Sequence, residues 1–512
     1  MNRRTYSVAM TERLSADAGL HLLRRDHQED LCFALWYPSQ GKTRTTALLH
    51  KLILPQAGER RVHGNASFLP HYFERAFGEA MNAHSGLAFL HSHLGPGWQD
   101  MSGDDIRAEE GHAGSTLGAT GLPLVGLTAG TDGAWSARFW EKTGPKGYTR
   151  RWSSNVRVVG RKLSVTWADR LVPPPRFKEE LRRTVSSWGE DIQASLARLR
   201  IGIVGAGSVG SIVAETLART GFQHLALIDF DTVERVNLDR LLHAGYEDAL
   251  MYRSKVATLS RGLRKSATAD NFEVDEVEWS VGEEEGFRVA LDCDVLFCCV
   301  DRPWGRSVLN FVAFAHLIPI VDGGIRVEVD KRRKLKRADW KAHIASPDRR
   351  CLECLEQYDP GLVTADREGY FDDPTYISGL PEDHPVRRNE NVFAFSLRAA
   401  SLEVLQMLMM VIAPLGIADA GQQTYHFVPG ILDPPRFEFC NAGCPYPVLV
   451  GRGDTTGLVV TGRHIFAERV RAQRDAVRKS IPWRYRVANS LSKVRHIILR
   501  RERRKTPSIR VG

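Results

Sequence analysis

Short apolar runs alternate with amphipathic segments along most of this 512-residue chain. Strand side chains alternate between two faces and helical side chains repeat every 3.6 residues, so the two patterns can be distinguished. Runs typical of strands cover residues 31–36, 47–54, 86–90, 135–140, 201–204, 225–228 and 295–300. Helical patterns cover residues 70–83, 103–112, 177–198, 208–220, 254–265, 304–316, 391–412 and 465–480. This alternation predicts an α/β fold with a mostly parallel sheet covered on both faces.

The length of the chain allows about three domains. Pro173–Pro175 form a stiff, extended spacer, and the strand at 135–140 closes the preceding unit. The boundaries expected from these features are an N-terminal domain over 1–149, a linker over 150–180, a second domain over 181–455 and a basic helical tail over 456–512.

The net charge of +9 is concentrated in the tail. From Arg463 onward Lys and Arg greatly outnumber Asp and Glu, whereas the rest of the chain is slightly acidic. Three interpretations stay open: a solvated basic helix, docking to an acidic protein, and contact with nucleic acid or an anionic membrane. No base-reading motif is present, so sequence-specific nucleic-acid binding is not expected. No run approaches the ~18 apolar residues of a transmembrane segment and no export signal is evident, so we expect a cytoplasmic protein.

A glycine-rich loop follows the strand at 201–204. Gly205, Gly207 and Gly210 have G-x-G-x-x-G spacing, which permits a tight turn, a close approach to phosphate and a helix start whose N–H groups face an anion. Asp229 ends the next strand, where an acid suits a ribose hydroxyl. Taken alone, this pattern is most typical of an NAD-binding domain.

Three further charged residues argue against a dehydrogenase. Arg240 and Lys255 can neutralise triphosphate charge, and Asp301, at the end of a later strand, can hold Mg²⁺. A dehydrogenase has no evident use for these groups, whereas an enzyme that attacks the α-phosphate of ATP needs them.

The order glycine loop, D-x-D, N-x-x-R, Lys255, Asp301 and IPIVDGG resembles the ThiF/MoeB/ubiquitin-activating adenylyltransferase family over residues 183–414. The resemblance implies a Rossmann-like domain that uses ATP and Mg²⁺ to join AMP to the C-terminal glycine of a ubiquitin-like protein. It also implies a homodimer in which Arg183, or its neighbour Arg182, reaches the ATP of the other protomer. The residues implied to bind the nucleotide and its metal are Gly205, Gly207, Gly210, Asp229, Asp231, Asn237, Arg240, Lys255 and Asp301.

Two histidines follow the strand at 86–90. His91 and His93 are two residues apart, so both side chains point to the same side of an extended strand. Asp105 lies in the first turn of the following helix, where it supplies a third ligand; Asp104 is the alternative in the neighbouring register. A His₂Asp set with an open position is typical of a catalytic zinc site, whose bound water loses a proton near neutral pH.

The array H-x-H followed by S-x-x-D resembles the JAMM/MPN (JAB) metalloprotease family, whose members cleave peptide or isopeptide bonds after ubiquitin-like C-termini. The resemblance implies a mixed α/β domain in which His91, His93 and Asp105 bind zinc. It further implies that Ser102 hydrogen-bonds the oxyanion of the intermediate and that Glu29 is the general base.

Parts of that assignment stay open. Asp26 and Asp30 lie beside Glu29 and compete with it for the role of general base. The sequence also departs from the family, because Leu94 replaces the usual proline and the loop before Ser102 is one residue longer.

Four of the eight cysteines form two close pairs, Cys351 with Cys354 and Cys440 with Cys444. Two pairs of thiolates brought together by the fold would make a closed, structural zinc site. The resemblance to the ThiF family supports this, since many members carry a paired-cysteine zinc site. The cysteines expected to pack in the core are Cys32, Cys293, Cys298 and Cys299.

No cysteine lies between Cys354 and Cys440, where ubiquitin-activating enzymes that form a thioester carry one. We therefore expect the reaction to stop at the acyl adenylate. An oxyester on Thr375 or Ser378 is a second hypothesis, and it requires a base to activate the hydroxyl.

Together the two resemblances predict a bifunctional enzyme of a bacterial ubiquitin-like pathway, with a suggested role in antiviral defence. The peptidase would process a ubiquitin-like protein, and the second domain would adenylate its exposed glycine; a conjugating enzyme is a further expected partner. Two alternatives remain: activation of a sulfur-carrier protein for cofactor or natural-product biosynthesis, and an inactive scaffold that only binds a ubiquitin-like protein.

Overall fold

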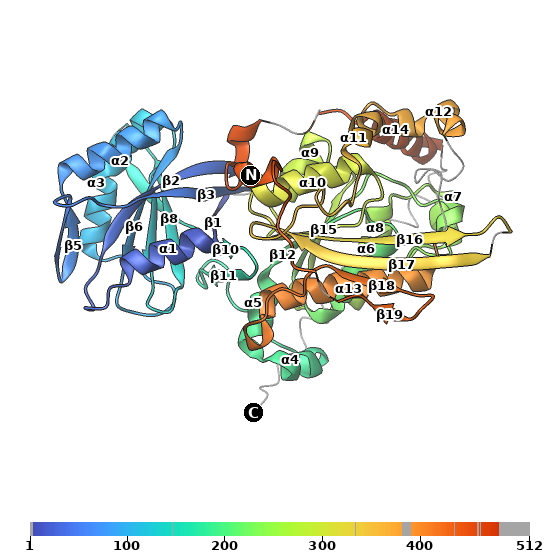
Figure 1. Cartoon of the computed structure of the whole chain (residues 1–512), viewed down its shortest axis with the longest axis horizontal. Coiled ribbons are helices and arrows are strands. Elements are labelled where there is room, and N and C mark those ends of the chain that lie inside the picture. The colour runs from blue at the N-terminus through green and yellow to red at the C-terminus, as the bar shows by residue number, and fades with distance from the viewer. Residues whose placement is uncertain are drawn as a thin grey trace.

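The computed structural model describes residues 4–145, 147–332, 334–380, 391–434, 436–457, 460 and 462–480. Most of the basic tail predicted at 456–512 therefore lies outside the described residues. Two large sheets lie side by side, each with helices on its faces (Figure 1).

The N-terminal sheet is mixed and has nine strands in the order β11-β10-β1-β3-β2-β6-β7-β8-β9. Its strands are β1 (Thr5–Thr11), β2 (Leu31–Gln40), β3 (Arg44–Ile53), β6 (Gly86–Ser92), β7 (Val125–Ala129), β8 (Trp135–Lys142), β9 (Tyr148–Trp152), β10 (Asn155–Val159) and β11 (Leu163–Trp167). A separate hairpin contains β4 (Arg60–His63) and β5 (Asn65–Phe68).

Strand β2 shows why this sheet carries helices on both faces. Alternate residues Cys32, Ala34 and Trp36 belong to one apolar cluster, which includes buried residues of α1 (Glu12–Leu22). The intervening residues Leu31, Phe33 and Leu35 belong to a second cluster with α2 (Pro70–Asn82) and α3 (Gly103–Thr120). A strand with apolar residues on both faces is thereby buried on both.

The prediction of a linker over residues 150–180 is wrong for its first part, up to Trp167. Residues 148–167 form β9, β10 and β11 of the first sheet, and β10 pairs in parallel with β1 at Ser7 and Asn155. Short strands with many polar residues give a weak apolar signal, so pairing with β1 and β8 decides their conformation. The connection between the two sheets begins only after Trp167.

The second sheet has eight strands in the order β14-β13-β12-β15-β16-β17-β18-β19. Neighbours from β14 to β16 pair in parallel, and those from β16 to β19 pair antiparallel. The strands are β12 (Arg200–Val204), β13 (His224–Ile228), β14 (Glu273–Val277), β15 (Val295–Cys298), β16 (Ile320–Val329), β17 (Leu335–Ala345), β18 (Gln423–His426) and β19 (Ile431–Leu432).

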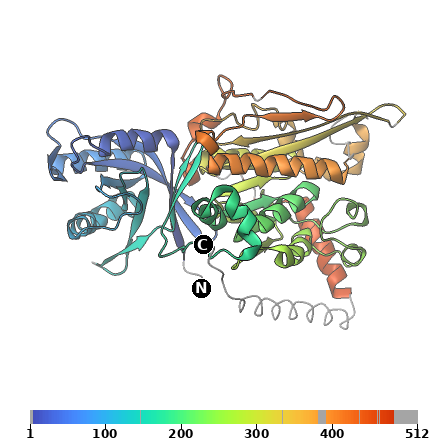
Figure 2. The ribbon, with the colours of Figure 1, turned by 90° about the horizontal axis from the view of Figure 1, so that it is seen from below.

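Helices cover both faces of this sheet. The helix α6 (Ser208–Thr220) packs on one face with α8 (Lys255–Ser266) and α13 (Phe393–Ile412), and α13 runs along the sheet in Figure 2. The opposite face carries α9 (Glu284–Ala290) and α10 (Pro303–Ala315). The remaining α-helices of the second half are α4 (Arg182–Trp188), α5 (Glu190–Arg198), α7 (Tyr246–Leu250), α11 (Pro360–Arg367), α12 (Pro374–Gly379) and α14 (Ile465–Ser480).

Two helix predictions need correction. The helix predicted at 177–198 is broken into α4 and α5 at Gly189, whose φ of 92° suits glycine and not a helix interior. The helix predicted at 391–412 begins at Phe393, with Val392 as its N-cap.

Among the described residues, α13 is the one helix long and apolar enough to cross a membrane. Its Ala399, Ala400, Val404, Met407 and Met410 lie in the core of the second sheet. This burial is the ordinary environment of a core helix.

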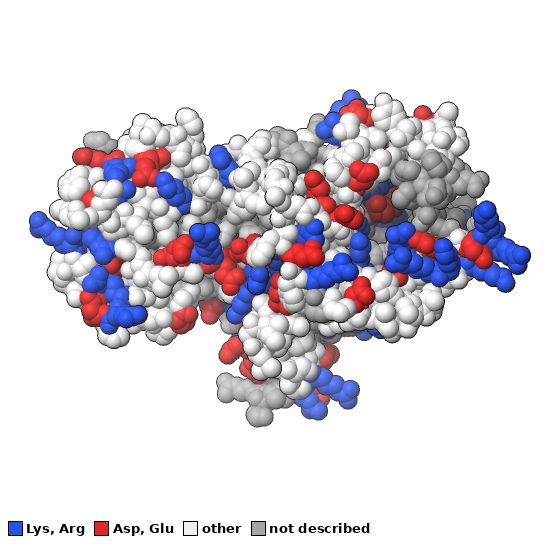
Figure 3. All heavy atoms as spheres, in the orientation of Figure 1, with Lys and Arg blue, Asp and Glu red and all other residues white. Residues whose placement is uncertain are grey.

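Basic side chains gather at the tip of the β16–β17 hairpin, on the right of Figure 3. The exposed residues there include Lys331, Arg332, Lys334 and Lys336. The positive charge of the chain is thus not confined to the tail.

Candidate nucleotide site and metal centres

A cavity of about 1820 Å³ opens at the carboxyl ends of β12, β13 and β15. Ligands of open α/β sheets bind at this edge, where the strand order reverses. Of the residues predicted to bind a nucleotide, all but Gly210 line this cavity: Gly205, Gly207, Asp229, Asp231, Asn237, Arg240, Lys255 and Asp301.

The glycine loop leaves room for an anion at the start of α6. Gly205 has φ of 96°, and a Cβ there would lie 2.5 Å from the Cys299 carbonyl oxygen. No atom would lie within 4 Å of a Cβ on Gly207, so that backbone faces open space. Gly207 is the N-cap of α6 and supplies no side-chain cap, which leaves N–H groups of the first turn for a phosphate. Gly210 lies behind this surface, where a Cβ would collide with the Gly205 carbonyl.

Asp229 is held by backbone donors at the end of β13. The N–H of Ala206 donates to its Oδ2 at 2.7 Å, and the N–H of Asp231 donates to its Oδ1 at 2.8 Å. Burial raises the pKa of Asp229 to about 6, against the opposing effect of Lys255. The carboxylate is thus fixed at the cavity wall, with lone pairs remaining for a ligand hydroxyl.

Lys255 lies between two carboxylates of the cavity. Its Nζ lies 2.8 Å from Asp231 Oδ2. Burial alone would lower the pKa of Lys255, but the carboxylates of Asp231 and Asp229 outweigh burial and raise it, so the side chain stays charged. Nearby, Asn237 Oδ1 accepts the Glu234 N–H at 3.0 Å, and Arg240 donates to the Val236 carbonyl at 2.7 Å. These bonds hold both polar groups at the mouth of the cavity.

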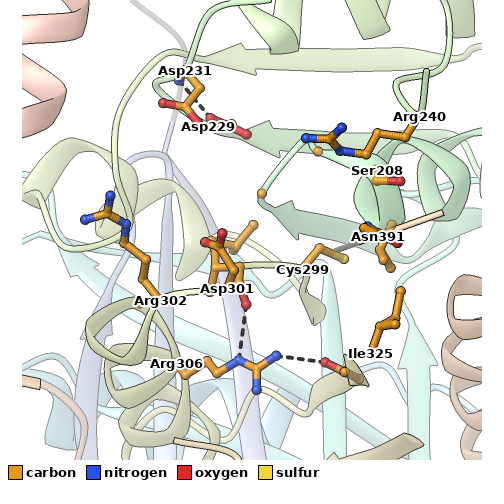
Figure 4. A pocket seen from close by; sticks show the side chains of 18 of the residues that line it. Ser208, Asp229, Asp231, Arg240, Cys299, Asp301, Arg302, Arg306, Ile325 and Asn391 are labelled. Carbon is orange, nitrogen blue, oxygen red and sulfur yellow. Dashed lines mark hydrogen bonds between the residues drawn. The ribbon is translucent and has the colours of Figure 1, made fainter. Parts of the chain in front are cut away.

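Asp301 lies in the middle of the cavity in Figure 4, with Arg240 and Ser208 to one side and Arg302 to the other. It is exposed and lies three residues after the end of β15. Arg302 was not predicted as a site residue, although it lines the cavity and pairs with Asp366 at 3.3 Å and with Asp372 at 2.5 Å. The only sequence feature that pointed to Arg302 was its position next to Asp301.

Arg182 and Arg183 do not reach this cavity within one chain. Both are exposed on α4, and neither lines the cavity. Thr375 and Ser378 are exposed on α12 and also lie outside its lining. The Ser378 hydroxyl donates to the Thr375 carbonyl at 2.9 Å, and within the described residues neither hydroxyl is hydrogen-bonded to a basic side chain.

A second candidate site lies at the end of β6. His91 Nε2 is 3.5 Å from Asp105 Oδ1, and His93 Nε2 is 3.2 Å from Asp105 Oδ2. One ligand atom from each residue lies within 4.8 Å of the others, a geometry that could hold a metal ion. Burial lowers the pKa of His91, which favours the neutral imidazole that a metal requires. The donor set and its spacing fit a zinc ion.

Ser102 and Asp105 are linked as a capping box at the start of α3. The Asp105 N–H donates to Ser102 Oγ at 3.2 Å, and the Ser102 N–H donates to Asp105 Oδ2 at 2.7 Å. This capping arrangement explains the S-x-x-D pattern locally. It also fixes Asp105 beside the histidines and leaves the Ser102 hydroxyl proton free to donate.

Three neighbouring acids have different environments. Asp26 pairs with Arg24 at 2.5 Å, and Asp30 is buried against Arg60 at 2.8 Å. Burial raises the pKa of Glu29, with a smaller upward effect from Asp105 and a downward effect from His93. Glu29 is therefore the acid of the three that shares an electrostatic environment with the candidate metal ligands.

The four paired cysteines converge in the second domain. The Sγ atoms of Cys351, Cys354, Cys440 and Cys444 lie within 4.8 Å of one another and could hold a metal ion. Backbone N–H groups of Cys351 and Cys354 donate to Sγ atoms of the cluster at 3.3 and 3.4 Å. Such bonds favour thiolates, the form that binds zinc.

The other cysteines are placed as predicted, with one exception. Cys32, Cys293 and Cys298 are buried in apolar clusters. Cys299 packs against the core but also lines the nucleotide cavity, where its Sγ lies 3.7 Å from Glu403 Oε2.

Comparisons with known proteins concern the second half of the chain. The model of the ThiF family matches residues 180–410. The SAMP-activating enzyme E1 of Haloferax volcanii is 30% identical over 178 residues, which are 34% of this chain and 60% of that protein. The molybdopterin-synthase adenylyltransferase of Escherichia coli is 32% identical over 140 residues, 27% of this chain and 54% of that protein.

Among solved structures, E. coli MccB with succinimide is 16% identical, with a TM-score of 0.40, over 52% of this chain and 74% of that chain. The matched family range begins after the first sheet and includes the glycine loop, Lys255 and Asp301. Residues 180–410 therefore form a domain of the ThiF family.

Proposed function

We propose that the ThiF-family domain adenylates the C-terminal carboxylate of a ubiquitin-like or sulfur-carrier protein. A carboxylate oxygen of that protein attacks the α-phosphorus of ATP. The bond from this phosphorus to the oxygen of the β-phosphate breaks, and pyrophosphate leaves. The products are an acyl adenylate and pyrophosphate.

The observation that carries the proposal is the meeting of anion-binding groups in one cavity. The open N-terminus of α6, Lys255 and Arg240 would neutralise the phosphates as negative charge shifts to the leaving group. Asp229 would accept hydrogen bonds from the ribose. Asp301 would hold Mg²⁺, which would supply positive charge to neutralise the phosphates.

The names of the curated relatives support this class of partner. One is an activating enzyme, and another is an adenylyltransferase of molybdopterin synthase. The adenylate could be consumed by transfer to a conjugating enzyme or by conversion to a thiocarboxylate in cofactor or natural-product biosynthesis. The first route is our main proposal, and it includes a homodimer in which Arg183, exposed on α4, reaches the other protomer's cavity.

We further propose that the N-terminal domain is a zinc peptidase of the JAMM type. His91, His93 and Asp105 would hold the ion, which when bound polarises water and the scissile carbonyl. Glu29 would take a proton from water and return it to the leaving nitrogen, and the Ser102 hydroxyl would donate to the oxyanion. The peptidase would expose the carboxylate that the other domain adenylates, in a cytoplasmic pathway of the kind used in antiviral defence.

The test is ATP–pyrophosphate exchange with a candidate ubiquitin-like protein, supplied with its C-terminus either extended or trimmed to glycine. Wild type, Asp301→Ala and Glu29→Ala are compared. Exchange should vanish in Asp301→Ala with both substrates, and Glu29→Ala should lose exchange only with the extended one.

Two results would contradict parts of the proposal separately. If Glu29→Ala supports exchange with the extended protein as well as wild type does, cleavage does not have to precede adenylation. Stable binding of the candidate protein without any exchange would leave an inactive scaffold as the function.

A further inference from the structure

The first part of the basic tail is docked on the second domain. Helix α14 bears Arg471, whose guanidinium donates to both oxygens of Glu283 at 2.6 and 2.9 Å. Arg474 pairs with Glu278, and the Arg471 guanidinium lies 4.1 Å from the centre of the Trp279 ring. Figure 2 shows α14 lying against the end of this domain.

These contacts are too buried for a solvated helix. The Arg471 side chain is 13% exposed and its partner Glu283 is 1% exposed, while Ala467 is fully buried. Removing one partner of such a pair leaves an uncompensated buried charge, so the pairs hold the helix in one position. Of the three interpretations of the tail, docking therefore applies to residues 464–480, and the partner is this chain itself.

Rings at the start of α14 pack between the loop after β13 and the first turn of α10, both at the nucleotide cavity. The His464 ring lies 4.9 Å from Phe230, after β13, and 4.8 Å from Trp304, after β15. The Phe466 ring is 5.9 Å from Phe230, and the Arg302 guanidinium lies 5.4 Å from its centre. The residues of α14 that line the cavity are Phe466, Val470 and Gln473, and His464 just before the helix also lines it.

The polar groups of the cavity indicate the orientation in which a nucleotide would bind. Ser208, at the start of α6, and Arg240 lie on one side of Asp301, and Arg302 lies on the other (Figure 4). A nucleotide whose phosphates face α6 and whose ribose meets Asp229 must place its base beyond Asp229, away from α6. Phe230 follows Asp229 directly and contacts the ring of Phe466, so α14 lies at this far end.

We propose that α14 closes the base end of the nucleotide cavity and that Phe466 contacts the purine. Phe230, Val281, Trp304 and Val470 supply the rest of an apolar surface there. Aromatic faces stabilise bases by stacking without requiring a particular hydrogen-bond pattern. This inference rests on the proposed use of ATP and adds a base-binding residue outside the residues matched to the ThiF family.

The experiment measures the dissociation constants of ATP and inorganic tripolyphosphate, each with Mg²⁺, for the full chain. Phe466→Ala removes the ring from the base end. Arg469→Ala is the control, because Arg469 is exposed on the same helix and does not line the cavity. Phe466→Ala should weaken ATP roughly tenfold and leave tripolyphosphate unchanged, because tripolyphosphate has no base.

A second variant tests the docking of the helix. Arg471→Glu opposes Glu283 and should release α14, with the same selective loss of ATP affinity. ATP affinity within twofold of wild type in both variants would overturn the inference and leave the proposed function standing. Equal weakening of ATP and tripolyphosphate would also overturn it, since the helix would then support the whole cavity and not the base. A wild-type chain that binds neither probe would overturn the proposed function itself.

Discussion

Arg44 Nη1 lies 2.6 Å from Asp294 Oδ1, and this buried pair joins the N-terminal sheet to the ThiF-family domain. The Arg44 guanidinium also donates to the carbonyl oxygens of Leu291 and Cys293, and Arg157 lies 3.6 Å from the same carboxylate. Nearby, Asp292 accepts hydrogen bonds from the backbone N–H and the hydroxyl of Thr43. The two halves of the chain are therefore linked by buried polar contacts and not by a flexible tether alone.

Arg44→Met should destabilise the chain by about 3–5 kcal/mol, because it leaves Asp294 buried beside a more distant cation. Urea unfolding followed by circular dichroism measures the change. Arg170→Met is the control, since Arg170 and Asp100 are both largely exposed and their pair should contribute less than about 1 kcal/mol. Equal midpoints for the two variants would show that the interface does not depend on this pair.

His316 should make the same interface sensitive to acid. Its Nδ1 shares a hydrogen bond of 2.8 Å with Ser39 Oγ across the two halves, and burial lowers its pKa from 6.5 to about 3. The unfolded chain then binds the proton more readily, so stability is complete above pH 6.5 and declines as the pH falls toward 3. Between pH 6.5 and 5 this residue should account for roughly 2 kcal/mol of lost stability.

The measurement is the unfolding free energy as a function of pH for wild type and His316→Gln, with His63→Gln as the exposed control. His316→Gln should flatten the decline below pH 6.5, and His63→Gln should leave it unchanged. An unchanged slope in His316→Gln would assign the acid sensitivity to other groups.

The two metal clusters should load independently. Elemental analysis by inductively coupled plasma mass spectrometry should find about two zinc ions per purified chain. One cluster provides four thiolate ligands and the other provides three ligands with an open position. Cys351→Ser and His93→Ala should each lose one ion and retain the other. Because a closed cysteine site is structural, only Cys351→Ser should lower the melting temperature substantially. Cys293→Ser is the control, because Cys293 is buried but lies outside the cluster, and this variant should retain both zinc ions.

Lys255→Ala should slow ATP–pyrophosphate exchange by about 10²–10³-fold, because a preorganised cation at the phosphates stabilises charge that develops in the transition state. Lys265→Ala is the matched control near the other end of α8, where the side chain is exposed. Comparable rates in the two variants would exclude Lys255 from phosphate binding.

Glu29→Gln should abolish cleavage of an extended ubiquitin-like protein while zinc content stays at the wild-type level, because glutamine keeps the shape of the side chain but cannot accept the proton. Asp26→Asn should retain cleavage, since Asp26 pairs with Arg24 and not with the candidate metal ligands. Loss of activity in Asp26→Asn with retention in Glu29→Gln would reverse the assignment.

Local patterns were sufficient for much of the ThiF-family domain. The strand before Gly205, the glycine spacing and the helix after it could be predicted because turn geometry and side-chain periodicity depend on neighbouring residues. Asp229, Lys255 and Asp301 follow strands or begin a helix at one sheet edge, so their convergence followed from parallel topology. The pairing of β9, β10 and β11 was missed because their short, partly polar runs gain stability only from neighbouring strands.

The sequence placed His91, His93 and Asp105 within reach of one ion, because two of them share a strand face and the third begins the next helix. It could not choose among Asp26, Glu29 and Asp30, since the choice depends on ion pairs such as that of Asp30 with Arg60, which only tertiary packing brings together. The sequence also left open what the basic helix α14 contacts. Only the fold shows that Glu283 lies opposite Arg471, because the contact between residues so distant in the chain depends on tertiary packing and not on local pattern.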